Sequence, residues 1–535
     1  MCGQSFPAPS NLTALTTLSP SPVIDSRPSR SCSTLHKNRK PYPVTYDLRS
    51  RLTDPSLLAD KAFIAGQWAI ADSGRTLAVD NPATGKEIAT VPDMGRTETA
   101  RAIDAACVAQ KKWAALTAGE RSKILRNWFE LIMANQEDLA IILTTEMGKP
   151  LAEARGEVAY GAAYVEWFAE EAKRAYGDMI PGHSDDKRIM VIKQPVGVVG
   201  SITPWNFPIA MIARKAAPAL AAGCTFISKP AKQTPLSALA LAVLAERAGV
   251  PTGVFSVLTS ASSSAIGAEF CENEKVRKLS FTGSTEVGRI LMRQASDQIK
   301  KLSLELGGNA PFIVFEDADI DEAVEGAILS KFRNAGQTCV CTNRIYAHDS
   351  IYDTFVEKLA KAVANLKIGD GLQEDIKIGP LIDKAAVAKV EEHIADALSK
   401  GATLVVGGKP DERGGRFFQP TVLRDVHQGM AVAREETFGP LAPVFRFSGV
   451  DEVIEMANDT IFGLAAYFYA RDLSRVFKVA EALEYGIVGV NTGLVSTEVA
   501  PFGGIKQSGT GREGSKYGMD DYMELKYICL GGIGS

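Results

Sequence analysis

Cys339 stands in a segment suited to a nucleophilic cysteine. The segment Asn334-Ala-Gly-Gln-Thr-Cys339 combines a glycine with polar residues, which favours a tight turn, and we expect this turn to lead into a helix. Backbone N–H groups at the start of a helix lower the pKa of a thiol and can bind an oxyanion. Taken alone, however, a free cysteine is more often an inert core residue. The assignment of Cys339 therefore depends on other parts of the chain.

Three further segments strengthen this assignment, and they are Thr203-Pro-Trp-Asn-Phe-Pro208, Glu305-Leu-Gly-Gly308 and Glu436-Thr-Phe-Gly-Pro440. In this order, and together with the cysteine segment, they resemble the motifs of the aldehyde dehydrogenase superfamily. The resemblance extends from about residue 63 to about residue 528. It implies that Cys339 is the nucleophile, Glu305 the general base and Asn206 a donor to the oxyanion.

The chemistry of aldehyde oxidation requires these residue types. An aldehyde releases hydride to nicotinamide only after a nucleophile has added to its carbonyl carbon, and a thiolate does so as a thiohemiacetal. The Asn206 amide and the backbone N–H of Cys339 would stabilise its oxyanion, and losing one such donor typically costs about 2.7–4 kcal/mol. Hydrolysis of the resulting thioester calls for a carboxylate that activates water, and Glu305 is suited to this role. Outside this constellation, Glu305 would be interpreted as a solvated or ion-paired residue.

The segment Phe281-Thr-Gly-Ser-Thr-Glu-Val-Gly288 predicts a strand, a glycine turn and a helix whose N-terminus can bind a phosphate. It is not a P-loop, because Arg289 and Ile290 follow Gly288, and it lacks the pattern G-x-G-x-x-G. The resemblance identifies it as the G-x-x-x-x-G variant of the superfamily. The cofactor-binding residues that the resemblance implies are Thr203, Pro204, Trp205, Lys229, Gly283, Ser284, Gly288, Glu436 and Phe438, of which the last two hold the nicotinamide ribose and ring.

Lys232 bears on the choice between NAD and NADP. It follows the second predicted strand, where a dinucleotide fold contacts the adenosine ribose. Strongly NAD-selective relatives tend to carry Glu at this position, where a carboxylate repels a 2′-phosphate. A lysine should attract that phosphate, which favours NADP or the use of both cofactors. The alternative is a surface lysine that points into solvent.

Two arginines point to a substrate with an anionic end. Arg214 follows Asn206 by eight residues, Arg333 precedes Cys339 by six, and arginine is suited to bidentate capture of a carboxylate. With Ser496, both positions resemble those of the succinate-semialdehyde dehydrogenases within the superfamily. We therefore expect an acidic semialdehyde such as succinate or glutarate semialdehyde. The alternative is that one or both arginines form structural ion pairs.

Cys341 is a candidate redox partner of Cys339. A disulfide needs a Cα separation of roughly 4.4–6.8 Å, which a bent i, i+2 segment can reach. Some relatives in the same subfamily also carry a cysteine here. Oxidation would then mask the nucleophile reversibly, whereas the alternative is a small core side chain.

The elements that must position these residues alternate between strands and helices. Apolar runs predict strands at residues 196–202, 224–228, 254–258 and 276–281, with helices at 211–222 and 235–248, the second capped by Thr234. A second series begins after Gly308, with strands at 311–315 and 344–347 and helices at 320–330 and 351–366. This pattern predicts an α/β protein with parallel, doubly wound sheets.

The expected fold is aldehyde dehydrogenase-like, with a Rossmann-type cofactor domain, an α/β catalytic domain and a small β oligomerisation arm. We assign residues 57–175 and 196–307 to the dinucleotide-binding domain, 308–510 to the catalytic domain, and 176–195 and 511–535 to the arm. Residues 187–194 and 522–528 alternate as exposed edge strands do, and such strands usually need a partner. A homodimer or homotetramer is therefore expected.

Composition excludes several other classes of protein. The chain has 535 residues, 46% apolar and 23% charged, and its net charge of −4 comes from well-mixed signs. This predicts a small-molecule substrate and neither nucleic-acid nor membrane binding. No apolar run reaches the roughly 18 residues of a membrane-spanning helix. The eight cysteines lack the spacing of a disulfide framework or a zinc site, so we expect a reducing compartment and no metal.

Residues 1–56 differ from the rest, being rich in Ser, Pro and Thr and basic between Arg27 and Arg49. We expect this segment not to fold with the core. It is compatible with a mitochondrial transit peptide or with the tail of a cytosolic enzyme, so the expected location is the mitochondrial matrix or the cytoplasm.

Two functions from other classes remain open at this stage. A cysteine with an amide donor and a carboxylate also suits a thioester-forming hydrolase or acyltransferase, which would need no nicotinamide. A non-catalytic binding protein on the same scaffold is the other alternative, because a fold alone does not imply activity. The intact set of Cys339, Glu305 and Asn206 argues against the latter.

Overall fold

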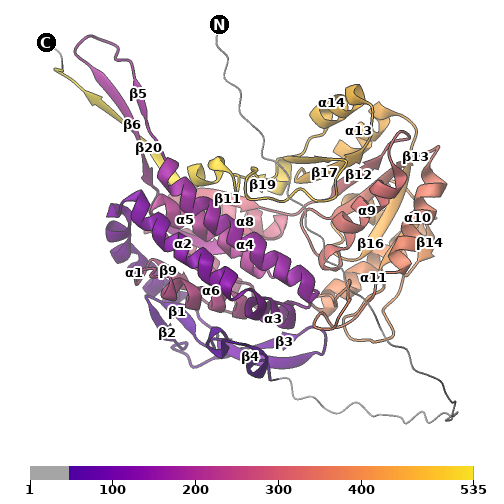
Figure 1. The fold of residues 1–535 in the computed structure, drawn as a ribbon, viewed down its shortest axis with the longest axis horizontal. Helices are drawn as coiled ribbons and strands as arrows, with labels where there is room; N and C mark the ends of the chain where they lie inside the picture. The colour runs from indigo at the N-terminus through magenta and orange to yellow at the C-terminus, as the bar shows by residue number, and fades with distance from the viewer. Residues whose placement is uncertain (1–46, 534–535) are drawn as a thin grey trace, which may run out of the picture. The chain divides into compact units, whose positions relative to one another are not determined.

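The computed structural model describes residues 47–533 and contains two large sheets, two small ones and the helices that cover them (Figure 1). The first large sheet has the order β19-β11-β10-β7-β8-β9-β1-β2. Its central strands run parallel, and they are β11 (Lys301–Glu305), β10 (Val276–Thr282), β7 (Val198–Ile202), β8 (Thr225–Lys229) and β9 (Phe255–Val257). Antiparallel strands β19 (Gly509–Thr510), β1 (Ala62–Ile64) and β2 (Gln67–Ala69) flank them.

Helices connect and cover these strands, as a doubly wound sheet requires. The connecting helices are α5 (Pro208–Ala222), α6 (Pro235–Arg247), α7 (Ser263–Glu272) and α8 (Thr285–Ala295). A second group lies between β2 and β7 in sequence. Of these helices, α1 (Arg96–Ala115) packs against β8 and α7, while α2 (Ala118–Ala134), α3 (Gln136–Met147) and α4 (Leu151–Glu171) pack around α5 and α6. A separate hairpin consists of β3 (Thr76–Asn81) and β4 (Lys86–Pro92).

The second large sheet has the order β14-β15-β16-β13-β12-β17-β18, and all its strands except β14 run parallel. The strands are β12 (Ala310–Val314), β13 (Thr342–His348), β14 (Thr403–Val406), β15 (Thr421–Val426), β16 (Leu441–Phe447), β17 (Ala465–Tyr469) and β18 (Ile487–Val490). The helices of this series are α9 (Ile320–Phe332), α10 (Tyr352–Ala364), α11 (Lys384–Ser399), α12 (Ala431–Arg434), α13 (Val450–Asn458) and α14 (Leu473–Ala482).

A three-stranded arm extends away from the two large sheets and their helices, next to the C-terminus (Figure 1). It pairs β5 (Asp178–Ile180) with β6 (Arg188–Pro195), and β6 with β20 (Met523–Leu530), all antiparallel. The two strands predicted as exposed edges are thus each other's partners. Leu525 and Tyr527 of β20 remain 70% and 59% exposed.

Two expectations about local structure need correction. Thr234 occupies the N-cap position of α6, but its hydroxyl does not cap the helix. Instead, the buried carboxylate of Glu146 accepts hydrogen bonds from the N–H groups of Leu236 and Ser237, both at 2.8 Å. The second concerns Cys339, whose turn leads into strand β13 rather than into a helix.

The folded body begins earlier than residue 57. Leu48 and Leu52 are buried in the core beneath α6, and the backbone N–H groups of residues 53 and 54 donate to the Asp138 carboxylate at 2.9 and 2.7 Å. Residues 47–56 therefore belong to the folded body, contrary to the expectation for residues 1–56. Residues 1–46 lie outside the described part of the chain. No helix within residues 47–533 has the length and apolar character needed to cross a membrane.

Candidate active site

The sequence-predicted residues meet where the two large sheets face each other. Thr203, Gly283 and Glu305 stand at the carboxyl ends of the parallel strands β7, β10 and β11. From the other sheet, Gly308 and Cys339 come just before the amino ends of β12 and β13. Ligands of open α/β sheets bind outside the carboxyl ends of the strands, so this is the expected place for a site.

A cavity of about 220 Å³ brings the cysteine together with the cofactor candidates. Its sequence-predicted lining residues are Pro204, Trp205, Asn206, Gly283, Ser284, Cys339, Glu436 and Phe438. The sequence analysis missed four others, namely Met211, Thr282, Leu306 and Gly307. Thr282, Leu306 and Gly307 stand inside motifs already recognised, and Met211 follows another by three residues, so position in the sequence was the available signal.

A larger cavity of about 740 Å³ shares several wall residues with the first. Lys229 and Lys232 line it, and so do Thr203 and the serines at 262–264. Ser262 caps the N-terminus of α7, and Lys229 donates to the Ser263 hydroxyl at 2.6 Å. Lys232 therefore lines a cavity, as a role in cofactor binding requires, although its side chain is also exposed to solvent. The sequence analysis missed the serines, although their run follows strand β9 directly.

These two cavities fit a dinucleotide. Ser284 caps the N-terminus of α8 immediately after the glycine turn, which leaves backbone N–H groups available to a phosphate. The hydroxyls of Thr203 and Thr282 are buried and have no hydrogen-bond partner within residues 47–533, as expected of groups that await a ligand. Gly288 lines neither of these cavities. A Cβ at Gly288 would lie 2.5 Å from Leu306, so this glycine permits close packing of α8 on the chain after β11.

The turn that carries Cys339, residues 334–341 and called the nucleophile turn below, has an unusual backbone conformation. Asn334 and Ala335 both have positive φ angles, of 53° and 54°, and the N–H of Cys341 bonds to the carbonyl of Thr338 at 3.1 Å. Such conformations cost free energy and cluster at functional sites. Within the described residues, the backbone N–H of Cys339 has no partner, so it is free to bind an oxyanion.

Electrostatics keep the Cys339 thiol protonated in the protein alone. Burial, together with the charges of Glu436 and Glu305, raises its pKa to about 12 against the opposing charges of Arg214 and Arg333. A neutral thiol needs a proton acceptor before it can attack a carbonyl carbon. Glu305 and Glu436 are the carboxyl groups whose charges affect the pKa of this thiol.

Asn206 lies across from the nucleophile turn and is 4% exposed. Its side-chain amide donates one hydrogen bond to the carbonyl of Gln337 at 3.1 Å, two residues before the cysteine. An amide NH₂ has two donors, so one remains for an oxyanion on the substrate. This geometry is compatible with the predicted role of Asn206.

Glu305 is buried and does not line the cavity that holds Cys339. One of its carboxyl oxygens, Oε2, has no hydrogen-bond partner within the described chain. Burial and the negative charge of Glu513 raise the pKa of Glu305 well above its usual range. A carboxyl with a raised pKa and a free oxygen is suited to accept a proton from water.

The structure also places the two remaining cofactor candidates. Glu436 accepts a hydrogen bond from the N–H of Gly308 at 3.2 Å, and burial raises the pKa of Glu436 to about 8. Phe438 has a φ of 53° and meets the Trp205 ring edge to face, with 5.6 Å between the ring centroids. These two side chains face the first cavity from the catalytic sheet.

The two substrate candidates differ in their surroundings. Arg214 forms a buried ion pair with Glu513, a residue that the sequence analysis missed. Arg333 makes no ion pair or hydrogen bond within residues 47–533, and its guanidinium lies 5.1 Å from the centre of the Phe207 ring. Arg333 and Ser496 line the same small cavity, together with Thr338 of the nucleophile turn.

Cys341, the candidate redox partner, is completely buried. The ammonium of Lys331 donates to its sulfur at 3.4 Å, and its thiol donates to the backbone carbonyl of the same lysine at 3.3 Å. Burial raises the pKa of Cys341, against the opposing effect of Lys331. Within the turn described above, Cys339 and Cys341 stand two residues apart in a bent segment.

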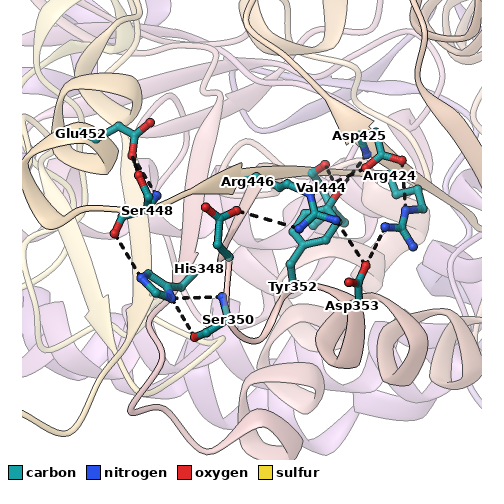
Figure 2. Close-up of polar contacts among 11 residues, drawn as sticks. His348, Ser350, Tyr352, Asp353, Arg424, Asp425, Val444, Arg446, Ser448 and Glu452 are labelled. Carbon is teal, nitrogen blue, oxygen red and sulfur yellow. Dashed lines mark hydrogen bonds and ion pairs between the residues drawn. The ribbon is translucent and has the colours of Figure 1, made fainter.

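A second polar cluster lies next to the carboxyl end of β13 in the second large sheet (Figure 2). Arg446 stacks on the Tyr352 ring, with its guanidinium carbon 3.6 Å from the ring centre, and binds Asp353 at 3.2 Å. This cluster adjoins His348, the last residue of β13, whereas Cys339 precedes that strand. Seven strand residues span about 20 Å, so the cluster stands apart from the cysteine. Its arginines are paired with Asp353 and Asp425, so neither guanidinium lacks a carboxylate partner.

Comparisons with known proteins support the resemblance to the aldehyde dehydrogenase superfamily. The model of the aldehyde dehydrogenase family matches residues 68–528. The succinate-semialdehyde dehydrogenase [NADP(+)] of Escherichia coli (strain K12) is 66% identical over 481 residues, which cover 90% of this chain and 100% of that protein. The glutarate-semialdehyde dehydrogenase of Pseudomonas aeruginosa is 65% identical, with coverage of 90% and 100%. A crystal structure of an NADP-dependent enzyme from E. coli superimposes with a TM-score of 0.89 at 66% identity, over 90% of this chain and 100% of that one, and confirms the expected fold.

Proposed function

The chain belongs to the aldehyde dehydrogenase family, and from this premise we propose that it oxidises succinate semialdehyde to succinate with NADP or NAD. The observation that carries the substrate class is Arg333, a cation without an ion pair that shares a cavity with Ser496 beside the nucleophile turn. A carboxylate on the substrate would supply a direct ion-pair partner for the Arg333 guanidinium. Neutral aldehydes have no group that could do so.

In the proposed mechanism, a carboxylate takes the proton of the Cys339 thiol as the sulfur adds to the aldehyde carbon. The thiohemiacetal oxyanion forms between the backbone N–H of Cys339 and the free amide N–H of Asn206. Nicotinamide, when bound, accepts the hydride. Glu305 then removes a proton from the water that attacks the thioester, and Cys339 leaves as the acid product is released.

The larger cavity supports NADP as the preferred cofactor. Lys229 and Lys232 both face it, and the nearby serine hydroxyls and the N-terminus of α7 add donors. Burial and the charge of Lys232 lower the pKa of Lys229 to about 8. A 2′-phosphate would relieve the repulsion between these two cations, which a 2′-hydroxyl cannot do.

A substrate panel tests this proposal. Steady-state turnover of succinate, glutarate and malonate semialdehydes and of butanal is measured with each cofactor by the absorbance of reduced nicotinamide. We expect the largest kcat/KM for succinate semialdehyde with NADP, and a much smaller one for butanal. Equal values for charged and neutral aldehydes would contradict the substrate class. Acid formation without reduced nicotinamide would instead identify a thioester-forming hydrolase or acyltransferase.

Glutarate semialdehyde is the second candidate substrate. The observation that favours it is the Pseudomonas relative, which is as similar to this chain as the succinate-semialdehyde enzyme is. The two acids carry the same charged end and differ by one methylene, which is worth only about 1–3 kcal/mol of discrimination. The ratio of the two kcat/KM values decides between them.

The arm supports a homodimer or homotetramer. Met179 of β5 and Leu525 and Tyr527 of β20 are each more than half exposed, as expected of a surface that another subunit covers. Light scattering on the purified protein measures the subunit number, and a monomer would contradict this part of the proposal. The compartment is proposed to be the mitochondrial matrix or the cytoplasm, and N-terminal sequencing of the protein from cells distinguishes a cleaved segment from an intact one.

A further inference from the structure

A buried ion pair lies directly behind the candidate oxyanion site. Lys149, just before α4, and Glu157, within α4, are in contact at 2.6 Å between Nζ and Oε2. Both side chains have no exposed surface. Neither of them lines the cavities described above, and the mechanism derived so far uses neither.

Both members of this pair hold the backbone around Asn206. The Lys149 ammonium donates to the carbonyl oxygen of Asn206 at 2.7 Å and lies 3.7 Å from the centre of the Phe207 ring. The other carboxylate oxygen of Glu157 accepts from the N–H groups of Ile209 at 2.9 Å and Ala210 at 3.3 Å. The ion pair is therefore bonded to the carbonyl of Asn206 and to the first turn of α5.

The nucleophile turn is also hydrogen-bonded to the backbone carbonyl of Asn206. Asn334 donates from its side-chain amide to the carbonyls of Asn206 and Gln337, both at 3.2 Å. The Asn206 amide in turn donates to the carbonyl of Gln337. The Asn206 carbonyl thus receives two donors, one from Lys149 and one from the segment that carries the cysteine. This network sets the position of Asn206 relative to Cys339.

A buried ion pair is a costly way to fill a protein core. Replacing such a pair by apolar residues of similar size is often neutral or stabilising, so stability alone does not account for its presence. In this pair, the donors and acceptors of both side chains bind each other and the backbone around Asn206. An oxyanion donor that is misplaced by about 1 Å can cost on the order of 100-fold in rate.

We propose that Lys149 and Glu157 are positioning residues that hold the Asn206 amide in the geometry needed to stabilise the oxyanion. This inference rests on the proposed role of Asn206. It predicts that the pair acts on the steps in which the oxyanion forms and collapses, and not on cofactor affinity.

A double-mutant cycle tests the inference on the full-length enzyme with succinate semialdehyde and NADP. The paired change Lys149→Met with Glu157→Gln removes both charges and keeps both side chains near their original size. We expect it to lower the single-turnover rate of hydride transfer by about 10- to 100-fold, while the Kd of NADP stays within about twofold. In an Asn206→Ala background, the same change should lower the rate by less than about twofold, because the group it positions is gone.

Lys278→Met is the matched control. Lys278 is a completely buried lysine of the first sheet that donates to Ser303, and it has no contact with Asn206. Its effect on the rate should be the same in both backgrounds. If the paired Lys149 and Glu157 change also costs the same in both backgrounds, these residues are structural and the inference is overturned.

Two further results are decisive. If Asn206→Ala leaves hydride transfer unchanged, the proposed role of Asn206 fails, and the positioning role fails with it. If the paired variant does not fold, Glu157→Asp replaces it in the cycle, because it keeps both charges but withdraws the carboxylate by one methylene. Coupling of Glu157→Asp to Asn206→Ala supports the inference, and additivity overturns it.

Discussion

The guanidinium of Arg214 forms an ion pair with the carboxylate of Glu513, and the two side chains are only 1% and 5% exposed. Lys215 binds the second oxygen of the same carboxylate. Burial alone would raise the pKa of Glu513, but the two cations outweigh it and hold the pKa below its usual range. Glu513 therefore stays ionised next to Glu305, and its charge adds to the burial that raises the pKa of Glu305.

This arrangement predicts the pH dependence of thioester hydrolysis. Because the pKa of Glu305 is raised, its basic form becomes abundant only at a higher pH than for an ordinary glutamate. We therefore expect hydrolysis of the acyl-enzyme to become faster as pH increases. The check is a stopped-flow comparison of the reduced-nicotinamide burst with the slower steady-state rate. Glu305→Gln should keep the burst, lose the pH-dependent steady-state phase and leave an acyl-enzyme visible by mass spectrometry. Full turnover by this variant would exclude Glu305 as the base.

Cys339→Ala tests the first covalent step. Without the thiol no thiohemiacetal can form, so we expect aldehyde oxidation to be abolished with both cofactors. The Kd of NADP, measured by fluorescence titration, should change little, because Cys339 does not line the larger cavity that contains Lys229 and Lys232. Residual hydride transfer above the uncatalysed rate would show that another group serves as the nucleophile.

The sequence located six of the fifteen strands that the described residues form in the two large sheets, and it placed the ends of these six within two residues. Buried parallel strands are continuous apolar runs bounded by glycine, proline or polar residues, and this signal is local. The prediction of a helix after Cys339 was wrong, because the backbone conformation of this turn depends on contacts between residues far apart in sequence. The positive φ angles of Asn334 and Ala335 depend on tertiary contacts, among them the Glu153 carboxylate that accepts from the N–H of Asn334 at 2.8 Å. No pattern along the chain contains that contact.

The candidate site shows the same division between local and distant information. Motifs identified Cys339 and Asn206, because a family resemblance carries residue identity. The ion pair of Arg214 with Glu513 joins residues far apart in sequence, and neither side chain indicates its partner. The carboxylate of Glu146 that caps α6 in place of Thr234 is a comparable case. Such partners become visible only when the packing is known.

Substituting Lys232 tests cofactor selectivity. Lys232→Glu places a carboxylate against the larger cavity, where it would repel a 2′-phosphate and accept from a 2′-hydroxyl. We expect the ratio of kcat/KM for NADP to that for NAD to fall by about 10-fold or more. Lys232→Gln is the control for loss of charge alone and should have a smaller effect in the same direction. An unchanged ratio in both variants would show that Lys232 does not reach the ribose.

Cys341 is predicted to confer reversible oxidation. Mild peroxide should inactivate the parent enzyme, and a dithiol should restore it, because a disulfide with Cys339 protects the nucleophile from further oxidation. In Cys341→Ala, the same treatment should leave activity that a dithiol does not recover. The contacts of Cys341 with Lys331 give the alternative, in which the cysteine only packs the core. Equal recovery of the two proteins would support that alternative.

The last prediction concerns recognition of the substrate carboxylate. Arg333 has no ion pair within residues 47–533 and lines a cavity with Ser496. Hydrogen bonds to charged groups contribute about 1.5–3 kcal/mol, so Arg333→Gln should lower kcat/KM for succinate semialdehyde by roughly 10- to 200-fold. Butanal, which has nothing for a guanidinium to bind, should be affected by less than about threefold.

Arg214 is expected to combine two effects. Its Nη2 atom is buried without a hydrogen-bond partner in the described chain, so it retains a donor for the substrate. Arg214→Ala also leaves the Glu513 carboxylate with one cation instead of two, and breaking a buried pair costs about 3–5 kcal/mol of folding free energy. The melting temperature therefore reports the ion pair, and the ratio of kcat/KM for succinate semialdehyde to that for butanal reports the substrate contact. If Arg214→Ala lowers only the melting temperature while Arg333→Gln lowers only the ratio, Arg214 is structural and Arg333 alone binds the carboxylate. If neither variant changes the ratio, the assignment to acidic semialdehydes fails, although the chain remains an aldehyde dehydrogenase.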